Sequence, residues 1–194
     1  MNETFKDKLT LEKKIDYLVE KCQEEDQQAF SQLYDLLIDK VYRYVYFKAV
    51  PSEVDDLVAI SFVKIWTNIK KYKKQKVSFS AWVFKVVRNV IIDHHRFHRS
   101  VDVLEDNIKD ERSEANPRHF TDLQMNSHVL KRALSELKEN YQQILVMKYL
   151  NDMSNDEIAY ALNKSRSTVR VLQFRALSAL RKILRKKQIR FSDF

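Results

Sequence analysis

The sequence predicts an all-α protein made of two small helical domains joined by a linker, the second containing a helix-turn-helix. Its 194 residues include no glycine and only two prolines, Pro51 and Pro117, whereas an average chain of this length carries about 14 glycines. Glycine-rich phosphate loops are therefore excluded, and hairpin-rich β-sheets are disfavoured. Apolar residues recur at helical spacing on both sides of a segment, 101–126, that lacks such periodicity.

Residues 1–26 form an acidic N-terminal extension. Its apolar residues have the spacing of one helix face, which predicts an extra helix packed on the first domain or on a partner: Leu11, Ile15, Leu18 and Cys22. The polar start does not resemble a secretory signal, and no apolar run approaches the ~20 residues of a membrane span. With a single cysteine, no internal disulfide is possible. We expect a cytoplasmic protein that does not insert into a membrane.

The first predicted domain covers residues 27–100. A helix is expected over 27–48 because its apolar residues share one face: Phe30, Leu33, Leu37, Val41, Tyr44 and Val45. Pro51 ends this helix, and Ser52 is expected to cap a second helix that extends to about residue 72. After a short basic segment, Ser78 is expected to cap a third helix that extends to about residue 99.

The second predicted domain covers residues 127–187, after an acidic linker at 101–126 and before a tail at 188–194. The linker alternatively acts as a nucleic-acid mimic in a basic channel. Ser154 and Glu157 form a capping box that begins a short helix, and Asn163 is suited to the left-handed turn that ends it. Ser165 then begins a basic helix over about 166–187. A short helix, a tight turn and a basic helix form a helix-turn-helix.

Two basic blocks dominate the charge distribution. Residues 63–100 and 163–194 each contain ten basic residues and one acidic residue, in a chain whose overall net charge is +8. Two separated cationic blocks are typical of a nucleic-acid-binding protein with two contact regions. The alternative is a pair of solvated lysine-rich helices.

The two blocks predict different DNA contacts. The start of a second helix-turn-helix helix enters the major groove, where arginines and hydroxyls contact bases and phosphates: Arg166, Ser167, Thr168, Arg170, Phe174 and Arg175. A helical hairpin in a protein-binding bundle is the alternative. The first block mixes cations with aromatic residues, which suits unpaired DNA: Lys70, Lys71, Tyr72, Lys73, Lys74, Lys76, Phe79, Trp82, Arg88 and Arg96. A place in the core is the alternative for Phe79 and Trp82, and for Trp82 it is the favoured interpretation.

Enzymatic and metal sites are not predicted. His94 and His98 are four residues apart on an expected helix and could share a face, but no glutamate separates them and arginines surround them. Histidines facing DNA or solvent are the favoured interpretation. No nucleophile and base have a recognisable spacing. We therefore expect no catalytic residue, metal or cofactor.

Motifs over residues 27–99 and 127–185 resemble the extracytoplasmic-function group of bacterial RNA polymerase sigma factors. The resemblance depends on the order and spacing of several short segments: Asp55-Asp56-Leu57-Val58, Phe62-Val63-Lys64-Ile65-Trp66, Phe79-Ser80-Ala81-Trp82, Arg88-Asn89, Asp156-Glu157-Ile158-Ala159 and Thr168-Val169-Arg170. It implies a subunit that binds core RNA polymerase and directs it to promoter DNA, both duplex and locally melted. It also implies an anti-sigma factor as a partner.

The resemblance implies roles for individual residues. The base-capture loop of the family falls on Lys73–Ser78, and Asn89 matches a position that lines the pocket for a flipped base of the −10 element. Four residues match positions that face the −35 element: Arg170, Val171, Phe174 and Arg175. Five residues lie in the segment that binds the polymerase clamp: Asp55, Asp56, Leu57, Phe62 and Trp66.

Departures from the family pattern also occur. Ala59-Ile60 replaces a usual Gln and acidic residue in the clamp-binding segment, and Asn163 replaces the usual glycine of the turn. Two other functions remain as alternatives. One is a free-standing helix-turn-helix regulator, which would not need the first basic block. The other is a DNA-processing enzyme that uses His94 and His98.

Overall fold

The computed structural model describes residues 3–74, 77–102 and 127–187 of the chain, with side chains described over 9–74, 77–97 and 129–187. Within these ranges the chain is helical or forms turns between helices, and it contains no strand. Lys76, the predicted linker from residue 103 onward and the tail at 188–194 lie outside the described residues. No helix of the described part is long and apolar enough to cross a membrane.

The chain begins with two antiparallel helices, α1 (Glu3–Gln23) and α2 (Gln27–Tyr46). Ile15, Leu18 and Cys22 of α1 are buried, as the spacing predicts for a helix packed on the first domain. Glu25 makes the turn with a left-handed φ of 68°. Asp26 then caps α2, because its carboxylate accepts hydrogen bonds from the backbone N–H groups of Gln28 and Ala29 at 2.8 and 3.0 Å.

Two further helices complete the first unit. The 3₁₀ turn η1 (Pro51–Glu53) precedes α3 (Val54–Asn68), which continues into a second 3₁₀ turn, η2 (Ile69–Lys71). The prediction that Ser52 caps this helix is wrong, because Ser52 lies inside η1 and Glu53 occupies the cap position without a side-chain hydrogen bond. The long helix α4 (Phe79–Asp102) follows, and the Ser78 hydroxyl accepts from the Ala81 N–H at 3.4 Å.

The second unit contains α5 (Ser127–Ser135), α6 (Glu139–Leu145), a π-helical turn η3 (Val146–Leu150), α7 (Asn155–Leu162) and α8 (Arg166–Lys186). The Ser154–Glu157 capping box is formed at the start of α7. Asn163 ends α7 with φ 54° and ψ 48°, the left-handed conformation that the sequence predicts. Ser165 caps α8 through the Thr168 N–H at 3.1 Å.

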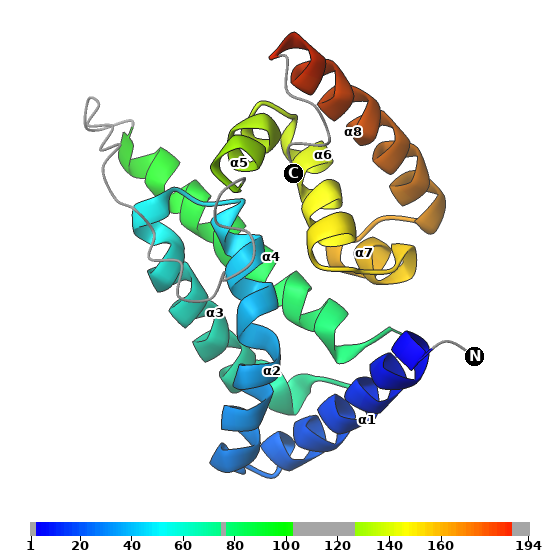
Figure 1. The fold of residues 1–194 in the computed structure, drawn as a ribbon. Helices are drawn as coiled ribbons and strands as arrows, with labels where there is room; N and C mark the ends of the chain where they lie inside the picture. Colours follow the sequence, from blue (N-terminus) through cyan, green and yellow to red (C-terminus); the bar gives the residue numbers. More distant parts are fainter. Residues whose placement is uncertain (1–2, 75–76, 103–126, 188–194) are drawn as a thin grey trace.

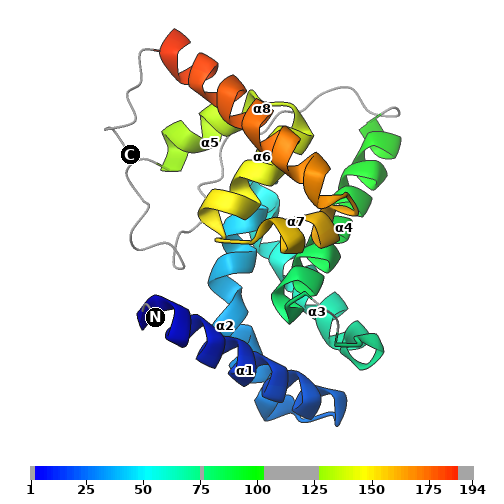
Figure 2. The ribbon, with the colours of Figure 1, turned by 90° about the vertical axis from the view of Figure 1, so that its right-hand side faces the viewer.

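The two units pack against each other through the side of α4 that faces α7 (Figures 1 and 2). Buried apolar residues of both units form one continuous cluster. In both views α8 lies on the outer side of the second unit, and α1 lies at the opposite end of the molecule. The arrangement leaves α8 accessible to a ligand while it partly covers α4.

Candidate nucleic-acid interface

The outer face of α8 is a continuous exposed surface. The inner face is buried through Val169, Ala176 and Leu180. All predicted duplex-contacting side chains are exposed, and they lie on the first two to three turns: Arg166, Ser167, Thr168, Arg170, Val171, Phe174 and Arg175. Val171 and Phe174 are 49% and 77% exposed. Large apolar side chains that protrude beside arginines are suited to contact with thymine methyl groups in a major groove.

Side-chain contacts hold the start of α8, directly after the turn of the helix-turn-helix. The Ser165 hydroxyl, besides capping α8, lies 2.9 and 2.8 Å from the hydroxyls of Ser167 and Thr168. Arg166 lies 3.4 Å from the Asp156 carboxylate of α7. These contacts fix the N-terminal turn of α8, the part that enters a groove.

The first basic block surrounds the end of α3. Lys70, Lys71, Lys73 and Lys74 are exposed, as expected of phosphate contacts, but Tyr72 is only 8% exposed. Its ring packs against the rings of Phe79 and Trp82, with centroids 4.9 and 5.5 Å away. Tyr72 is therefore part of the core, and Trp82 lies in the same aromatic cluster. The predicted stacking of a base on Tyr72 has no accessible ring face in this arrangement.

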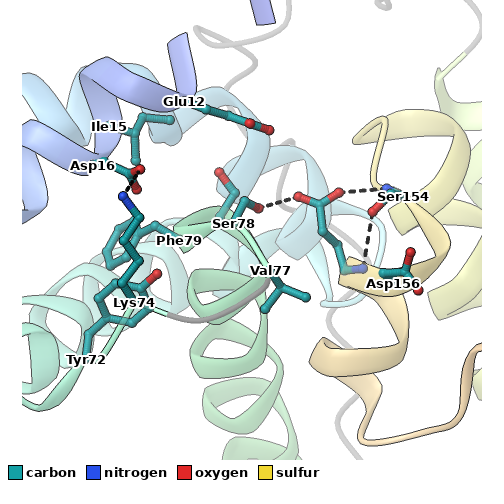
Figure 3. A pocket seen from close by; sticks show the side chains of 12 residues that line it. Glu12, Ile15, Asp16, Tyr72, Lys74, Val77, Ser78, Phe79, Ser154 and Asp156 are labelled. Atoms are coloured by element: carbon teal, nitrogen blue, oxygen red, sulfur yellow. Dashed lines mark hydrogen bonds and ion pairs between the residues drawn. The ribbon is translucent and has the colours of Figure 1, made fainter. Parts of the chain in front are cut away.

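Carboxylates from α1 and from the turn after it bind two of these lysines, which the sequence did not predict. The Lys74 ammonium lies 2.8 Å from the Asp16 carboxylate (Figure 3), and their hydrogen bond raises the pKa of Lys74. Lys70 pairs with Glu25 at the turn after α1. The partners are 58 and 45 residues apart in sequence, so no local pattern identifies them.

The α4 residues predicted to contact the −10 element differ in exposure. Asn89 and Arg96 are exposed, and Arg88 is half-buried. Arg88 and Arg96 line a cleft of about 510 Å³ between α4 and the second unit, together with Lys48, His95 and Glu139. The cleft brings three cations close together at the edge of α4, which suits a phosphate, while Glu139 of α6 supplies an opposing charge.

Polar contacts hold the second unit on this surface. Ser78, at the start of α4, hydrogen-bonds to the capping-box residue Glu157 (Figure 3). The Gln142 amide donates to the Phe47 carbonyl at 2.7 Å and accepts from the Lys48 ammonium at 3.1 Å. The Arg43 guanidinium donates to the Leu150 carbonyl. The structure therefore covers part of the predicted −10 surface while the predicted −35 surface remains exposed.

Two of the predicted clamp-binding residues, Phe62 and Trp66, line an apolar groove of about 370 Å³ on α2 and α3. Phe30, Tyr34, Phe62 and Trp66 line the groove. Asp55 and Asp56 are exposed on the same helix, about two turns before Phe62 and Val63. Leu57 is 1% exposed and lies in the core, so it supports α3 without access to a partner.

A second apolar groove lies on the second unit, where no site was predicted. It has a volume of about 320 Å³ and is lined by aliphatic side chains of α5, α6, η3 and α8, with one tyrosine: Leu130, Leu134, Leu145, Tyr149, Leu150, Leu177, Leu180 and Leu184. The sequence of α8 carries one signal that could have predicted this groove. Leucines lie on both sides of its buried apolar stripe, and their number exceeds what the packing of one helix face requires.

The described part of the chain contains no group of three metal-ligating side chains. His94 lies 3.7 Å from the Glu53 carboxylate. The side chain of His98 is outside the described residues, so the expectation that it could share a face with His94 is not tested.

Two family models match the chain: "Sigma-70 region 2" over residues 30–101 and "Sigma-70, region 4" over residues 127–180. The sigma factor BldN of Streptomyces coelicolor is 28% identical over 170 residues, which cover 86% of this chain and 64% of that relative. SigM of Bacillus subtilis is 26% identical over 154 residues, which cover 77% of this chain and 91% of SigM.

The fold is similar to that of a solved complex, the sigma factor RpoE with the anti-sigma factor NepR from Bartonella quintana. The TM-score is 0.68 at 18% identity, covering 80% of this chain and 96% of that chain. The two matched regions coincide with the units that carry the exposed α8 and the cationic end of α3.

Proposed function

This chain belongs to the extracytoplasmic-function RNA polymerase sigma factors, with sigma-70 regions 2 and 4. From that premise we propose which part of the promoter each of its surfaces binds. It directs RNA polymerase to promoters and initiates transcription. The region 4 unit binds the −35 element as a duplex through α8. The region 2 unit binds the −10 element, including a melted strand, through the end of α3 and through α4. No step requires a catalytic residue.

The observation that carries this proposal is the placement of two cationic surfaces of different kinds on two helical units. The outer face of α8 is a protruding helix suited to a major groove. The end of α3 is a short turn ringed by lysines beside an aromatic cluster. A protein that binds duplex DNA without polymerase needs the first surface and does not need the second.

For the −10 element, Asn89 supplies an exposed amide on α4, and Lys71 and Lys73 supply cations within reach of strand phosphates. Extraction of a base from the stack costs a few kcal/mol, which contacts to the flipped base must offset. An amide donates and accepts hydrogen bonds, so Asn89 can bind a base edge in both ways.

For the polymerase, we assign the groove of Phe30, Tyr34, Phe62 and Trp66 as the docking surface, with Asp55 and Asp56 exposed about two turns earlier on α3. An apolar groove with carboxylates on the same helix suits a helical partner with apolar and basic side chains. The groove of leucines on the second unit is a second candidate contact for the same large partner.

An anti-sigma factor is proposed as the off-state partner. The support is the solved RpoE complex, whose described partner is the anti-sigma factor NepR. We place the protein in the cytoplasm, at the nucleoid through its polymerase.

Run-off transcription tests the proposal directly. Purified core polymerase is incubated with this protein and a genomic fragment library, and the transcripts are sequenced. We expect transcripts that start at a defined set of promoters and that depend on the protein. A protein that footprints tightly by itself, with no gain from core polymerase, would support the free-standing regulator and contradict the sigma function.

A further inference from the structure

Helix α1 precedes the residues that match region 2, which begin at residue 30. It packs along α2 and also contacts η2, the 3₁₀ turn that ends α3.

One side chain of α1 hydrogen-bonds to the backbone at η2. The Gln23 amide nitrogen donates to the carbonyl oxygens of both Ile69 and Tyr72, at 3.0 and 2.8 Å. The Ile69 carbonyl also accepts from the Tyr72 N–H at 3.0 Å, the hydrogen bond that closes η2, so the Gln23 amide is its second donor. Gln23 is part-buried and supplies both donors of its amide to this end. It therefore fixes the backbone where the chain leaves η2.

This backbone is the stem of the predicted loop at 73–78. Tyr72 leaves η2 in an extended conformation, with φ −66° and ψ 130°. Its ring contacts Phe79 on the other side of the loop, with centroids 4.9 Å apart. Gln23 holds the first end of the stem through hydrogen bonds to its backbone. The aromatic cluster joins the two ends through the side chains of Tyr72 and Phe79. Two paired lysines flank the stem: Lys74 with Asp16 of α1, and Lys70 with Glu25 of the turn after α1.

We propose that Gln23 is a positioning residue for capture of the melted −10 strand, acting through the stem of the loop; this inference rests on the proposed sigma function. A binding loop that is fixed before binding loses less conformational freedom when the strand arrives. Without the amide donors, the Tyr72 carbonyl loses its bond to Gln23 and the Ile69 carbonyl keeps only the bond from the Tyr72 N–H. The backbone that leads from η2 into the loop is then free to take more directions. Helix α1 then belongs to the DNA-binding apparatus.

A purely structural role of Gln23 predicts a different effect of its loss than a positioning role does. If Gln23 only attaches α1 to the core, its loss lowers the thermal stability and weakens every DNA contact by the same factor. If it positions the loop, its loss acts on melted −10 DNA and on discrimination among −10 bases. Duplex −35 binding, made by α8 at the other end of the molecule (Figure 2), stays unchanged.

The test uses holoenzyme assembled with Gln23→Leu, which removes the donors, or Gln23→Glu, which replaces them by an acceptor. Gln32→Leu, on the exposed face of α2, is the matched control. Affinity is measured on fork-junction DNA with a single-stranded −10 element and on a duplex −35 fragment. We expect about tenfold weaker fork binding for both Gln23 variants and a change below about twofold on the −35 duplex. Gln32→Leu should match the wild type.

Equal affinities of wild type and Gln23 variants for fork DNA would overturn the proposal, as would equal losses on both DNAs. If Gln23→Leu does not fold, Gln23→Lys decides, since an ammonium group carries three donors: its fork affinity must exceed that of Gln23→Glu, or the proposal fails. Failure of the wild-type holoenzyme to bind fork DNA would refute the sigma function itself. Failure of the variants to differ from a competent wild type refutes the role of Gln23 alone.

Discussion

At the scale of single residues, exposure decides which predicted contacts are available. Arg170, Val171 and Phe174 protrude from α8, whereas Tyr72 and Leu57 lie in the core. The sequence pattern could not separate these groups, because aromatic and aliphatic residues of a binding surface and of a core share helical spacing. Tyr72 and Leu57 therefore affect binding only by positioning the residues around them.

Arg170→Ala and Arg175→Ala are each expected to weaken binding of the −35 duplex by roughly 1–3 kcal/mol, because a bidentate arginine–guanine contact is lost. Arg181→Ala, exposed further along α8, is the control. Binding of holoenzyme to −35 fragments with single base changes is the measurement. A loss of the same size for every sequence would assign these arginines to phosphates.

Asn89→Ala should reduce promoter opening while duplex −35 binding is retained, because the exposed amide on α4 contacts a flipped base only after melting. A loss of 1–3 kcal/mol is expected, roughly one to two powers of ten in the opening equilibrium. Permanganate reactivity of unpaired thymines measures the opening. Equal losses in opening and in −35 binding would argue against the assigned contact.

Lys131→Met should stabilise the protein. Burial lowers the pKa of Lys131 to about 8, and its ammonium has no hydrogen-bond partner, although it lies 4.0 Å from the centre of the Tyr46 ring. Partial solvent access and the cation–π contact reduce the penalty, so we expect a gain of about 1 kcal/mol and about 2–4 °C in Tm.

The pH dependence checks this cause. Between pH about 8 and 10.5 the unfolded chain holds a proton on Lys131 that the folded chain has released. The free energy of unfolding of the wild type should therefore rise with pH in this window. The difference from Lys131→Met should shrink in parallel. A constant difference across the window would show that the ammonium charge is not the cause.

At the scale of elements, the signals that predicted the fold correctly are local ones. The capping box of Ser154, the left-handed turn at Asn163 and the cap at Ser165 each involve residues within a few positions of one another. Contacts between distant segments, such as Asp16 with Lys74, were not predictable because many acidic residues could pair with many lysines. The Ser52 cap failed because Pro51 begins a 3₁₀ turn that includes Ser52.

Ser165→Ala tests how far the cap controls the DNA-binding end of α8. Loss of the bond from the Thr168 N–H should cost about 1 kcal/mol of stability, and fraying of the first turn should weaken −35 binding. Ser178→Ala, an exposed serine later in α8, should change neither Tm nor −35 binding. A variant with lowered Tm and unchanged −35 affinity would show that the first turn is held by DNA itself.

At the scale of the whole molecule, the packing of α7 on α4 cannot persist on a promoter. Elements centred at −10 and −35 are about 25 base pairs apart, roughly 85 Å along B-DNA. A compact chain of this length has a radius of gyration of only about 16 Å. The two units must separate for both elements to be bound, and the contacts from Ser78, Gln142 and Arg43 to the opposite unit must break.

Gln142→Ala should favour the separated state, because it removes the bonds to Phe47 and Lys48. A loss of about 1 kcal/mol shifts the equilibrium about fivefold. Small-angle scattering should show a larger radius of gyration, and the free protein should bind single-stranded −10 DNA more tightly. Gln28→Ala, on the exposed start of α2, serves as the control. Unchanged scattering and affinity would show that other contacts hold the units together.

The exposed α8 and the partly covered α4 also impose an order of events. A chain in the packed arrangement meets duplex DNA with its −35 surface available, while Ser78 and Arg88 of its strand-binding surface are half-buried. Replication forks, repair gaps and nascent RNA offer unpaired bases throughout a bacterial cell, and a fully open strand-binding surface would bind them. Packing of the second unit on α4 leaves only the exposed lysines and Asn89 to such competitors, so the full set of strand contacts forms after polymerase has separated the units at a promoter.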